Sequence, residues 1–119
     1  MASGTVNVQP TAVMNAIYPT ISNAENYSGF GNTFYRKFGN LVQVHVGIKG
    51  LVSTAIQGAK ATIFTLPSGY IPDSAISSNG QGGNTYTSLA YGIVGADGTV
   101  KISSDDQYAM VDFLFIAVN

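Results

Sequence analysis

Residues 41–49 place the strongest constraint on what this chain can fold into. In this stretch, LVQVHVGIK, apolar and polar side chains alternate with a period of two. The apolar members are Val42, Val44, Val46 and Ile48, and the polar members are Gln43, His45 and Lys49. Such alternation is typical of a β-strand that buries one face and exposes the other. We therefore predict a half-buried strand here, preceded by a second strand that ends at Gly39-Asn40.

The rest of the chain after Thr33 continues the β pattern. The run KATIFTL is rich in β-formers, and SLAYGIV and TVKIS flank the turn GADG, where Asp97-Gly98 predicts a hairpin. The segment SSNGQGGNTYTS, residues 77–88, consists of turn-forming residues and is predicted to be an irregular loop. The final run, YAMVDFLFIAV, is apolar on both faces except at Asp112. It predicts a strand between the domain interior and either another layer or a neighbouring subunit.

The number and spacing of these strands predict the fold class. We expect an all-β fold, an antiparallel β-sandwich or jelly-roll-like head domain, over residues 33–119. Residues 1–32 are small, polar and turn-rich, and we expect them to form an N-terminal arm or linker. Because residues 1–30 contain no Lys or Arg and no sufficiently long apolar run, we expect no signal peptide there.

The chain is poor in charge. Only 9% of its residues are charged, against about 25% in a typical domain. The net charge is −1 and the five Lys and Arg residues are scattered, which argues against nucleic-acid binding. A monomer with so few charges would have an adhesive surface, so we expect copies of the chain to cover much of it. With no cysteine, the chain has neither disulfides nor thiolate chemistry.

The corner FTLPSGYIPDSA, residues 64–75, concentrates conformationally special residues. Pro67 ends the preceding strand because it cannot donate a ladder hydrogen bond. Gly69 permits a backbone conformation that other residues avoid, and Pro72 forces Ile71 into an extended state. We therefore expect the corner to hold Tyr70 rigidly, with its ring closing one end of the domain.

Four features in one order carry a family resemblance: a GN-LV-V-V-G strand, the TLPSGYIP corner, the GADGTVKI hairpin and a short aromatic last strand. Over about Tyr35 to Val118 the chain resembles the C-terminal head of receptor-binding proteins in tailed phages of Gram-positive bacteria, the lactococcal type among them, and related tail-fibre tips. Such corners often carry a basic residue or a second aromatic where this chain has Ile71. The resemblance implies a trimeric β-sandwich head, located at a virion tail tip, that binds saccharides on a host cell surface.

Two groups of polar residues are candidates for binding. His45, the only histidine, lies on the polar face of its predicted strand. It suits a saccharide contact, a residue on a trimer axis, a metal ligand or an ordinary hydrogen-bonded strand histidine. Asp105 and Asp106 form a carboxylate cluster that suits turn chemistry, calcium or sugar hydroxyls. Adjacent turn residues point apart, so this pair is poorly suited to glycoside hydrolysis.

The Gly-rich segment after residue 76 and two tyrosines complete the candidate set. Its Asn, Gln and Ser side chains both donate and accept hydrogen bonds, as sugar hydroxyls require, although a connection without a ligand has the same composition. Tyrosine rings offer the apolar surface on which sugars stack. The candidate saccharide-binding residues are His45, Asn84, Tyr86, Tyr91, Asp105 and Asp106.

Asp112 poses a separate question because an unpaired carboxylate among apolar residues is costly. We expect it either to pair with Arg36 or Lys37 or to face a solvated groove, where it could accept sugar hydroxyls.

The leading hypothesis is a non-enzymatic host-adhesion module: a homotrimer with no cofactor or metal, whose partners are a cell-wall saccharide and other tail or baseplate proteins. The alternative is a purely structural tail or baseplate protein. A depolymerase or esterase is disfavoured because the chain has no cysteine, no G-x-S-x-G motif and a single histidine.

Overall fold

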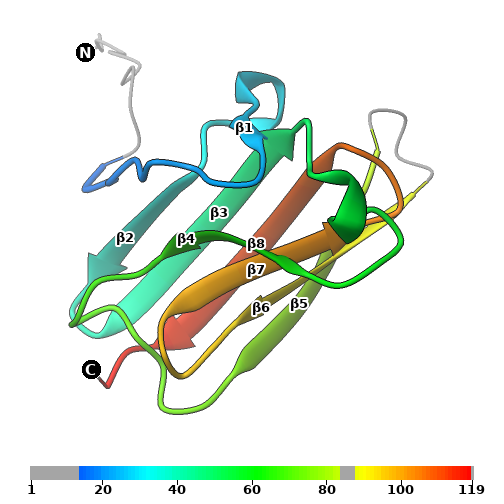
Figure 1. Cartoon of the computed structure of the whole chain (residues 1–119). Helices are drawn as coiled ribbons and strands as arrows, with labels where there is room; N and C mark the ends of the chain where they lie inside the picture. The colour runs from blue at the N-terminus through cyan, green and yellow to red at the C-terminus, as the bar shows by residue number, and fades with distance from the viewer. Residues whose placement is uncertain (1–13, 84–87, 119) are drawn as a thin grey trace, which may run out of the picture.

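The computed structural model describes residues 14–83 and 88–118, and within them the chain is all-β (Figure 1). Two single 3-10 turns, η1 (Ser28–Phe30) and η2 (Ser53–Ala55), are its only helical segments there. The strands are β1 (Glu25–Asn26), β2 (Phe34–Phe38), β3 (Leu41–Lys49), β4 (Ala61–Thr65), β5 (Ile76–Gln81), β6 (Leu89–Val94), β7 (Thr99–Ser104) and β8 (Ala109–Ile116). No helix in the described part of the chain is long and apolar enough to cross a membrane.

All strand pairs are antiparallel and belong to one sheet. The strand order is β1-β3-β8-β5-β6-β7-β4, and β2 pairs with β3 as well. Between β5 and β8 the only register pair is Gln81 with Met110, whereas β3 and β8 pair along their whole length. The sheet therefore bends at the β5–β8 junction and curls into a half-barrel, so that β4 and β7 cross in front of β3 and β8 in Figure 1.

The core fills the space inside this curl. Val42, Val44, Val46 and Ile48 of β3 are completely buried, which confirms the predicted half-buried strand. The last strand contributes Val111, Phe113 and Phe115, and β6, β7 and β4 contribute Ala90, Val94, Val100, Ile102 and Ile63. Each of the buried Val, Ile and Phe side chains stabilises the fold by about 1.5–3 kcal/mol on burial. The inner face of β8 is thus buried as predicted, while its outer face is exposed in this chain.

Both predicted hairpins are present. Gly39 has a φ of +59° at the first turn position between β2 and β3, a conformation typical of a type II′ turn. In the β6–β7 turn, Gly98 has a φ of +87°, and its N–H donates to the carbonyl of Gly95 over 2.9 Å. Asp97 Oδ1 accepts from Thr99 Oγ1 at 2.7 Å and Thr99 N at 3.1 Å, which lowers the pKa of Asp97.

The prediction of an irregular loop over residues 77–88 is wrong for its first part. Residues 77–81 belong to β5, which pairs with β6 along its whole length. Small residues suit this strand because it lies against another backbone: a Cβ added at Gly80 would collide with the carbonyl oxygen of Met110. Cross-strand pairing therefore overrides the turn propensity of the individual residues.

The proline corner holds Tyr70 as expected. The Tyr70 ring packs on the core and meets Tyr35 edge-on, with centroids 5.1 Å apart. Lys37 Nζ lies 4.6 Å from the Tyr70 ring centroid and donates to the carbonyl of Gly69 over 2.5 Å. Pro72 is fully buried and forms a bridge with Ala117. The corner thereby fastens the end of β2 to the segment that follows β8.

The segment before β1 spans the opening between the two ends of the curled sheet. Ile17 exchanges backbone hydrogen bonds of 2.8 and 3.0 Å with Tyr35 in β2. Ser22 N donates to Ile63 O in β4 over 2.8 Å, and Asn23 Nδ2 donates to Thr62 O over 2.7 Å. Residues 17–23 thus connect β2 to β4.

Candidate functional site

The segment from Asn26 to Thr33 crosses the outer face of β3 at Gly47. The Tyr27 N–H donates to the Gly47 carbonyl over 2.8 Å at one side of the crossing. A side chain at position 47 would block it, because an added Cβ would collide with the carbonyl oxygen of Gly31. Gly47 therefore interrupts the polar side of β3 so that another piece of backbone can lie against it.

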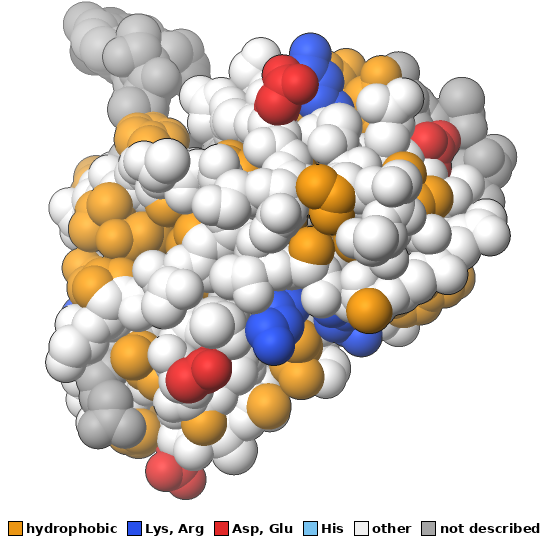
Figure 2. Space-filling view, in the orientation of Figure 1, with side chains coloured by type: hydrophobic (Ala, Val, Ile, Leu, Met, Phe, Trp, Pro, Cys, Tyr) orange, Lys and Arg blue, Asp and Glu red, His pale blue; other side chains and the backbone are white. Residues whose placement is uncertain are grey.

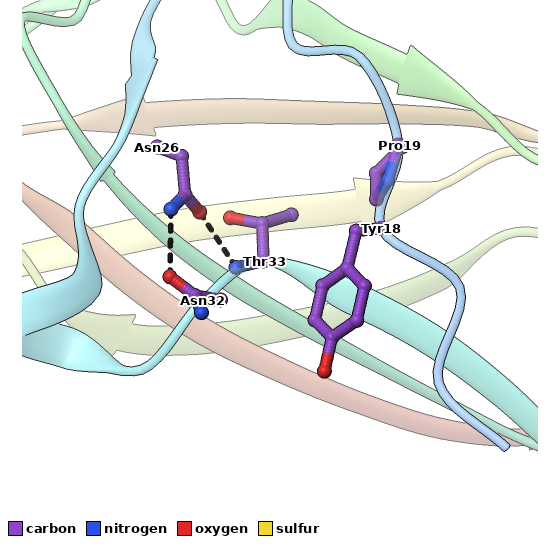
Figure 3. A pocket seen from close by; sticks show the side chains of 5 residues that line it. All are labelled: Tyr18, Pro19, Asn26, Asn32 and Thr33. Carbon is purple, nitrogen blue, oxygen red and sulfur yellow. Dashed lines mark hydrogen bonds between the residues drawn. The ribbon is translucent and has the colours of Figure 1, made fainter. Parts of the chain in front are cut away.

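Thr33 anchors the end of the crossing segment. Its buried hydroxyl donates to the carbonyl of Gly47 and accepts from the Gly47 N–H, both over 3.0 Å. The Thr33 N–H donates to Asn26 Oδ1 over 2.7 Å, and Asn26 Nδ2 donates to Asn32 Oδ1 over 2.9 Å (Figure 3). Each member of this network fixes the next, so the two asparagine amides have defined orientations.

A surface pocket of about 320 Å³ lies beside this network. Its lining residues are Tyr18, Pro19, Asn26, Asn32 and Thr33. None of them is charged, and the exposed Tyr18 ring and the asparagine amides are its chemically distinctive parts (Figure 3). A lining that combines an apolar ring surface with amide donors and acceptors matches a ligand that carries both C–H surfaces and hydroxyl groups.

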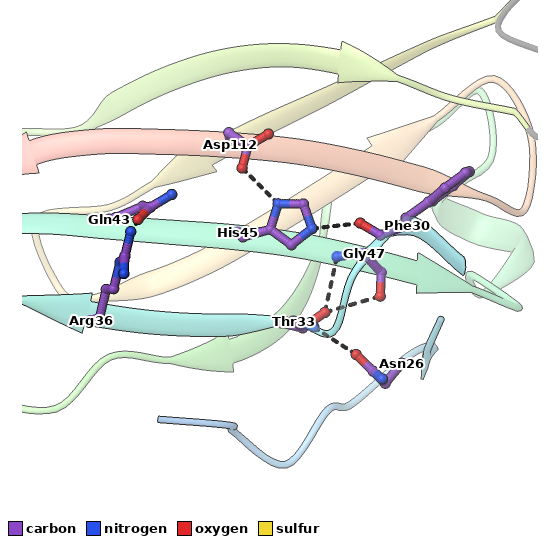
Figure 4. A network of polar contacts seen from close by, with 8 residues as sticks. All are labelled: Asn26, Phe30, Thr33, Arg36, Gln43, His45, Gly47 and Asp112. Atoms are coloured by element: carbon purple, nitrogen blue, oxygen red, sulfur yellow. Dashed lines mark hydrogen bonds and ion pairs between the residues drawn. The ribbon is translucent and has the colours of Figure 1, made fainter. Parts of the chain in front are cut away.

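His45 lies under the same segment and uses both ring nitrogens. Nδ1 lies 2.6 Å from Asp112 Oδ1, and Nε2 lies 2.7 Å from the backbone carbonyl oxygen of Phe30 (Figure 4). The hydrogen bond that His45 donates to Asp112 raises the pKa of His45, burial of the ring acts in the opposite direction, and the bond to the Phe30 carbonyl adds to the increase. Register places the two residues opposite each other on β3 and β8.

Aromatic and cationic groups continue along the outer face of β2. The Phe34 ring stacks on the imidazole of His45 with centroids 5.7 Å apart. The Arg36 guanidinium lies 5.8 Å from the Phe34 centroid and 5.1 Å from that of Phe38, and its Nε donates to Gln43 Oε1 over 2.6 Å. These contacts hold the Arg36 guanidinium flat against the sheet.

The other end of this outer face is apolar. Register places Leu41 beside both Phe38 and Ile116, so the three side chains are neighbours across β2, β3 and β8. Leu114 and Ile116 are 64% and 58% exposed. We call Phe38, Leu41, Leu114, Ile116 and Val118 the apolar face. Contiguous exposed apolar residues of this kind are typical of an interaction surface.

Few charged groups interrupt the surface. Figure 2 shows only a few Lys, Arg, Asp and Glu side chains on the viewed side, with polar and hydrophobic atoms over most of the surface. Among the described residues, no three His, Asp or Glu side chains are grouped so that they could hold a metal ion.

The structure places the predicted binding residues in separate regions. His45 is on the outer face of β3, whereas Tyr91 is half-buried on β6, next to Asn79 and Ser103 in register. Asp105 and Asp106 are exposed in the turn after β7, where Asp105 Oδ2 accepts from Leu89 N over 3.3 Å. The two remaining predicted residues, Asn84 and Tyr86, lie outside the described residues.

The predicted partners of Asp112 are wrong. Asp112 pairs with His45, while Arg36 bonds to Gln43 and to the carbonyl of Met14, and Lys37 bonds to Gly69. The reason is register: β8 pairs with β3, so its one charged residue faces the histidine at the middle of that strand. Asp112 also remains open to water, with a side chain 60% exposed.

Sequence reasoning missed the pocket. Tyr18, Asn26 and Asn32 lie in the region predicted to be an arm, and their proximity depends on Ile17 pairing with Tyr35 and on the crossing at Gly47. The available signal was the asparagine-rich run NAENYSGFGN, residues 23–32, which is rich in the same amide groups as the predicted loop.

No protein-family model matches the chain, and no curated protein is significantly similar to it.

Proposed function

We propose that this chain is a non-enzymatic host-adhesion module that binds a cell-surface saccharide, as at the tip of a phage tail. The observation that carries the proposal is the pocket whose lining has no charged residue and combines the Tyr18 ring with the amides of Asn26 and Asn32. A neutral sugar presents C–H faces for the ring and hydroxyls for the amides, and it gains little from charged groups. The low overall charge of the chain and its resemblance to phage receptor-binding heads support the same class.

Preorganisation of its polar groups supports binding at this pocket. Asn26 is held by Thr33 and Asn32, and Thr33 is held by the backbone of β3. A site whose groups are already oriented loses less conformational entropy when its ligand arrives. The residues predicted from the sequence, around Tyr91 and Asp105–Asp106, form a second candidate surface, which the experiment below compares directly with the pocket.

We further propose that the chain is a homotrimer in which the apolar face is buried between copies. Within each chain, the two halves of the curled sheet then form the two layers of a sandwich-like head. The trimer as a whole belongs to a virion, where it lies beside other tail proteins. Several weak sites on one particle then act together, and the avidity exceeds the affinity of a single site by orders of magnitude.

A purely structural tail or baseplate protein is the second candidate, and the apolar face is the observation that favours it. An exposed cluster such as Leu114 and Ile116 suits assembly whether or not a glycan is bound. The two candidates differ only in ligand binding.

Calorimetric titration with cell-wall polysaccharide fragments of Gram-positive bacteria separates them. We expect Tyr18→Ala and Asn32→Ala to weaken binding at least about tenfold, since each removes a principal contact. Asn40→Ala, at an exposed asparagine in the β2–β3 turn, is the matched control and should leave binding unchanged. Loss of binding in Tyr91→Ala or Asp106→Ala instead would move the site to the second surface. No binding by the unmodified chain would favour the structural role.

A further inference from the structure

We propose that a proton on His45 holds the segment from Asn26 to Thr33 against β3 and thereby shapes the pocket, so that saccharide binding weakens as that proton is lost. This inference rests on the proposed function for its ligand. Its structural half, the attachment of the segment by the His45 proton, can be tested without any ligand.

The hydrogen-bond partners of His45 determine its protonation state. A carboxylate and a backbone carbonyl only accept hydrogen bonds, and these are the partners of Nδ1 and Nε2. A neutral imidazole has one N–H and one lone pair, so it satisfies one partner and turns a lone pair toward the other. Only the imidazolium, with two N–H groups, donates to Asp112 and Phe30 together.

Deprotonation affects the two bonds unequally. The bond to the charged carboxylate is the stronger of the two, so the remaining proton stays on Nδ1. Nε2 then presents its lone pair to the carbonyl oxygen of Phe30 at the present distance of 2.7 Å, an unfavourable contact. The β3–β8 connection therefore survives, and the contact with the crossing segment is the one that is lost.

The other charged or titratable groups near His45 do not replace this contact. On β2, Arg36 is bound to Gln43, and on β3, Lys49 lies over the Tyr27 ring at 5.5 Å. In the crossing segment, Tyr27 packs on Tyr108 from the turn before β8, with centroids 5.4 Å apart. On β8 the facing group is Asp112 itself. Asp112 is therefore the acid–base partner that controls His45.

The pocket is close to this contact along the chain. Phe30, which accepts the His45 bond, and Thr33, which is fixed to Gly47, enclose only Gly31 and Asn32. Asn32, whose amide lines the pocket, lies between these two anchors. The anchor at Phe30 is the one that depends on the His45 proton. When that anchor is released, Asn32 keeps its bond from Asn26 and the anchor at Thr33 but loses the anchor at Phe30, so its position is held less firmly.

Proton NMR tests the structural half directly, because the chain has one histidine and thus one imidazole C–H pair to follow. We expect the His45 midpoint above 6.5, the ordinary value, and the backbone amides of Phe30 to Thr33 to shift with the same midpoint. Asp112→Asn should lower that midpoint. Amides of 30–33 that do not follow the imidazole would overturn the proposal.

The second half of the proposal, the effect on binding, is tested by measuring the affinity for the same polysaccharide fragments at several pH values. We expect the wild-type chain to bind about fivefold more weakly above the His45 midpoint than below it, as for the loss of one positioning hydrogen bond. His45→Leu, which has no hydrogen-bond donor, should bind at the weak level at every pH, and Lys101→Gln, a charge change on β7, should keep the wild-type profile.

The outcomes separate this inference from the proposed function. Binding that is independent of pH in the wild-type chain would overturn the link between His45 and the pocket, whatever the NMR result. No binding at any pH, with coupled imidazole and amide titrations, would overturn the saccharide function and the pocket half of the proposal, and would confirm the proton-dependent anchor.

Discussion

Gly92 of β6 faces Phe113 of β8 across the interior of the curled sheet. A Cβ added to Gly92 would lie 2.5 Å from Phe113 Cζ and 3.0 Å from atoms of Val111 and Ile102. The Phe113 ring therefore occupies the space that a side chain at position 92 would need. This contact joins the two halves of the sheet where no backbone ladder connects them, since β5 and β8 pair only at Gln81 and Met110.

Replacing Gly92 with alanine should destabilise the fold by about 1–3 kcal/mol, because a methyl group in a filled core forces its neighbours to move. Urea denaturation followed by tyrosine fluorescence measures the change. Gly39→Ala is the comparison: nothing lies within 4 Å of its added Cβ, so its cost of about 1 kcal/mol comes only from the positive φ. A smaller loss for Gly92→Ala than for Gly39→Ala would contradict this account of the core.

The parts of the fold predicted from the sequence are those set by local pattern. The alternation in β3 and the Asp97-Gly98 turn depend on neighbouring residues, and both predictions are confirmed. β5 was missed because its small polar residues form a strand only when β6 and the backbone of β8 lie beside them. The His45–Asp112 pair and the pocket likewise depend on which strands pair, and composition does not specify that order.

The stability that His45 and Asp112 contribute should fall with rising pH. Asp112 raises the pKa of His45 in the folded chain, so the contribution is fully present below about 6.5 and is lost as pH rises through the folded value. Because the Asp112 side chain is 60% exposed, we expect a contribution of about 1 kcal/mol or less.

Urea denaturation of the wild-type chain and Asp112→Asn at several pH values measures that contribution. The wild-type advantage should be largest at pH 5 to 6 and should shrink above pH 6.5. Asp73→Asn, at an exposed corner position, serves as the control and should give a difference without this pH dependence. An advantage that grows with pH would reverse the assigned sign.

The corner prediction concerns Tyr70 and Lys37. Tyr70→Leu removes the edge contact with Tyr35 and the ring under the Lys37 ammonium, and should cost about 1–3 kcal/mol of unfolding free energy. Lys37→Met keeps the aliphatic stem and should cost about 1 kcal/mol. Ser68→Ala, exposed in the same corner, should change stability by no more than about 0.5 kcal/mol in the same denaturation assay. Equal losses of unfolding free energy in all three variants would mean that the Tyr70 ring is not what stabilises the corner.

The apolar face makes a prediction about assembly. If it is buried between copies, light scattering after size exclusion should give three times the chain mass of 12.4 kDa, and Leu114→Lys with Ile116→Lys should return the protein to monomers. The reason is that two charges would be placed in an interface core, where charged residues are depleted. Leu89→Lys is the control, because Leu89 is 53% exposed but lies on β6, in the other half of the sheet. A wild-type monomer would remove the trimer from the proposal, and the apolar face would then require another partner.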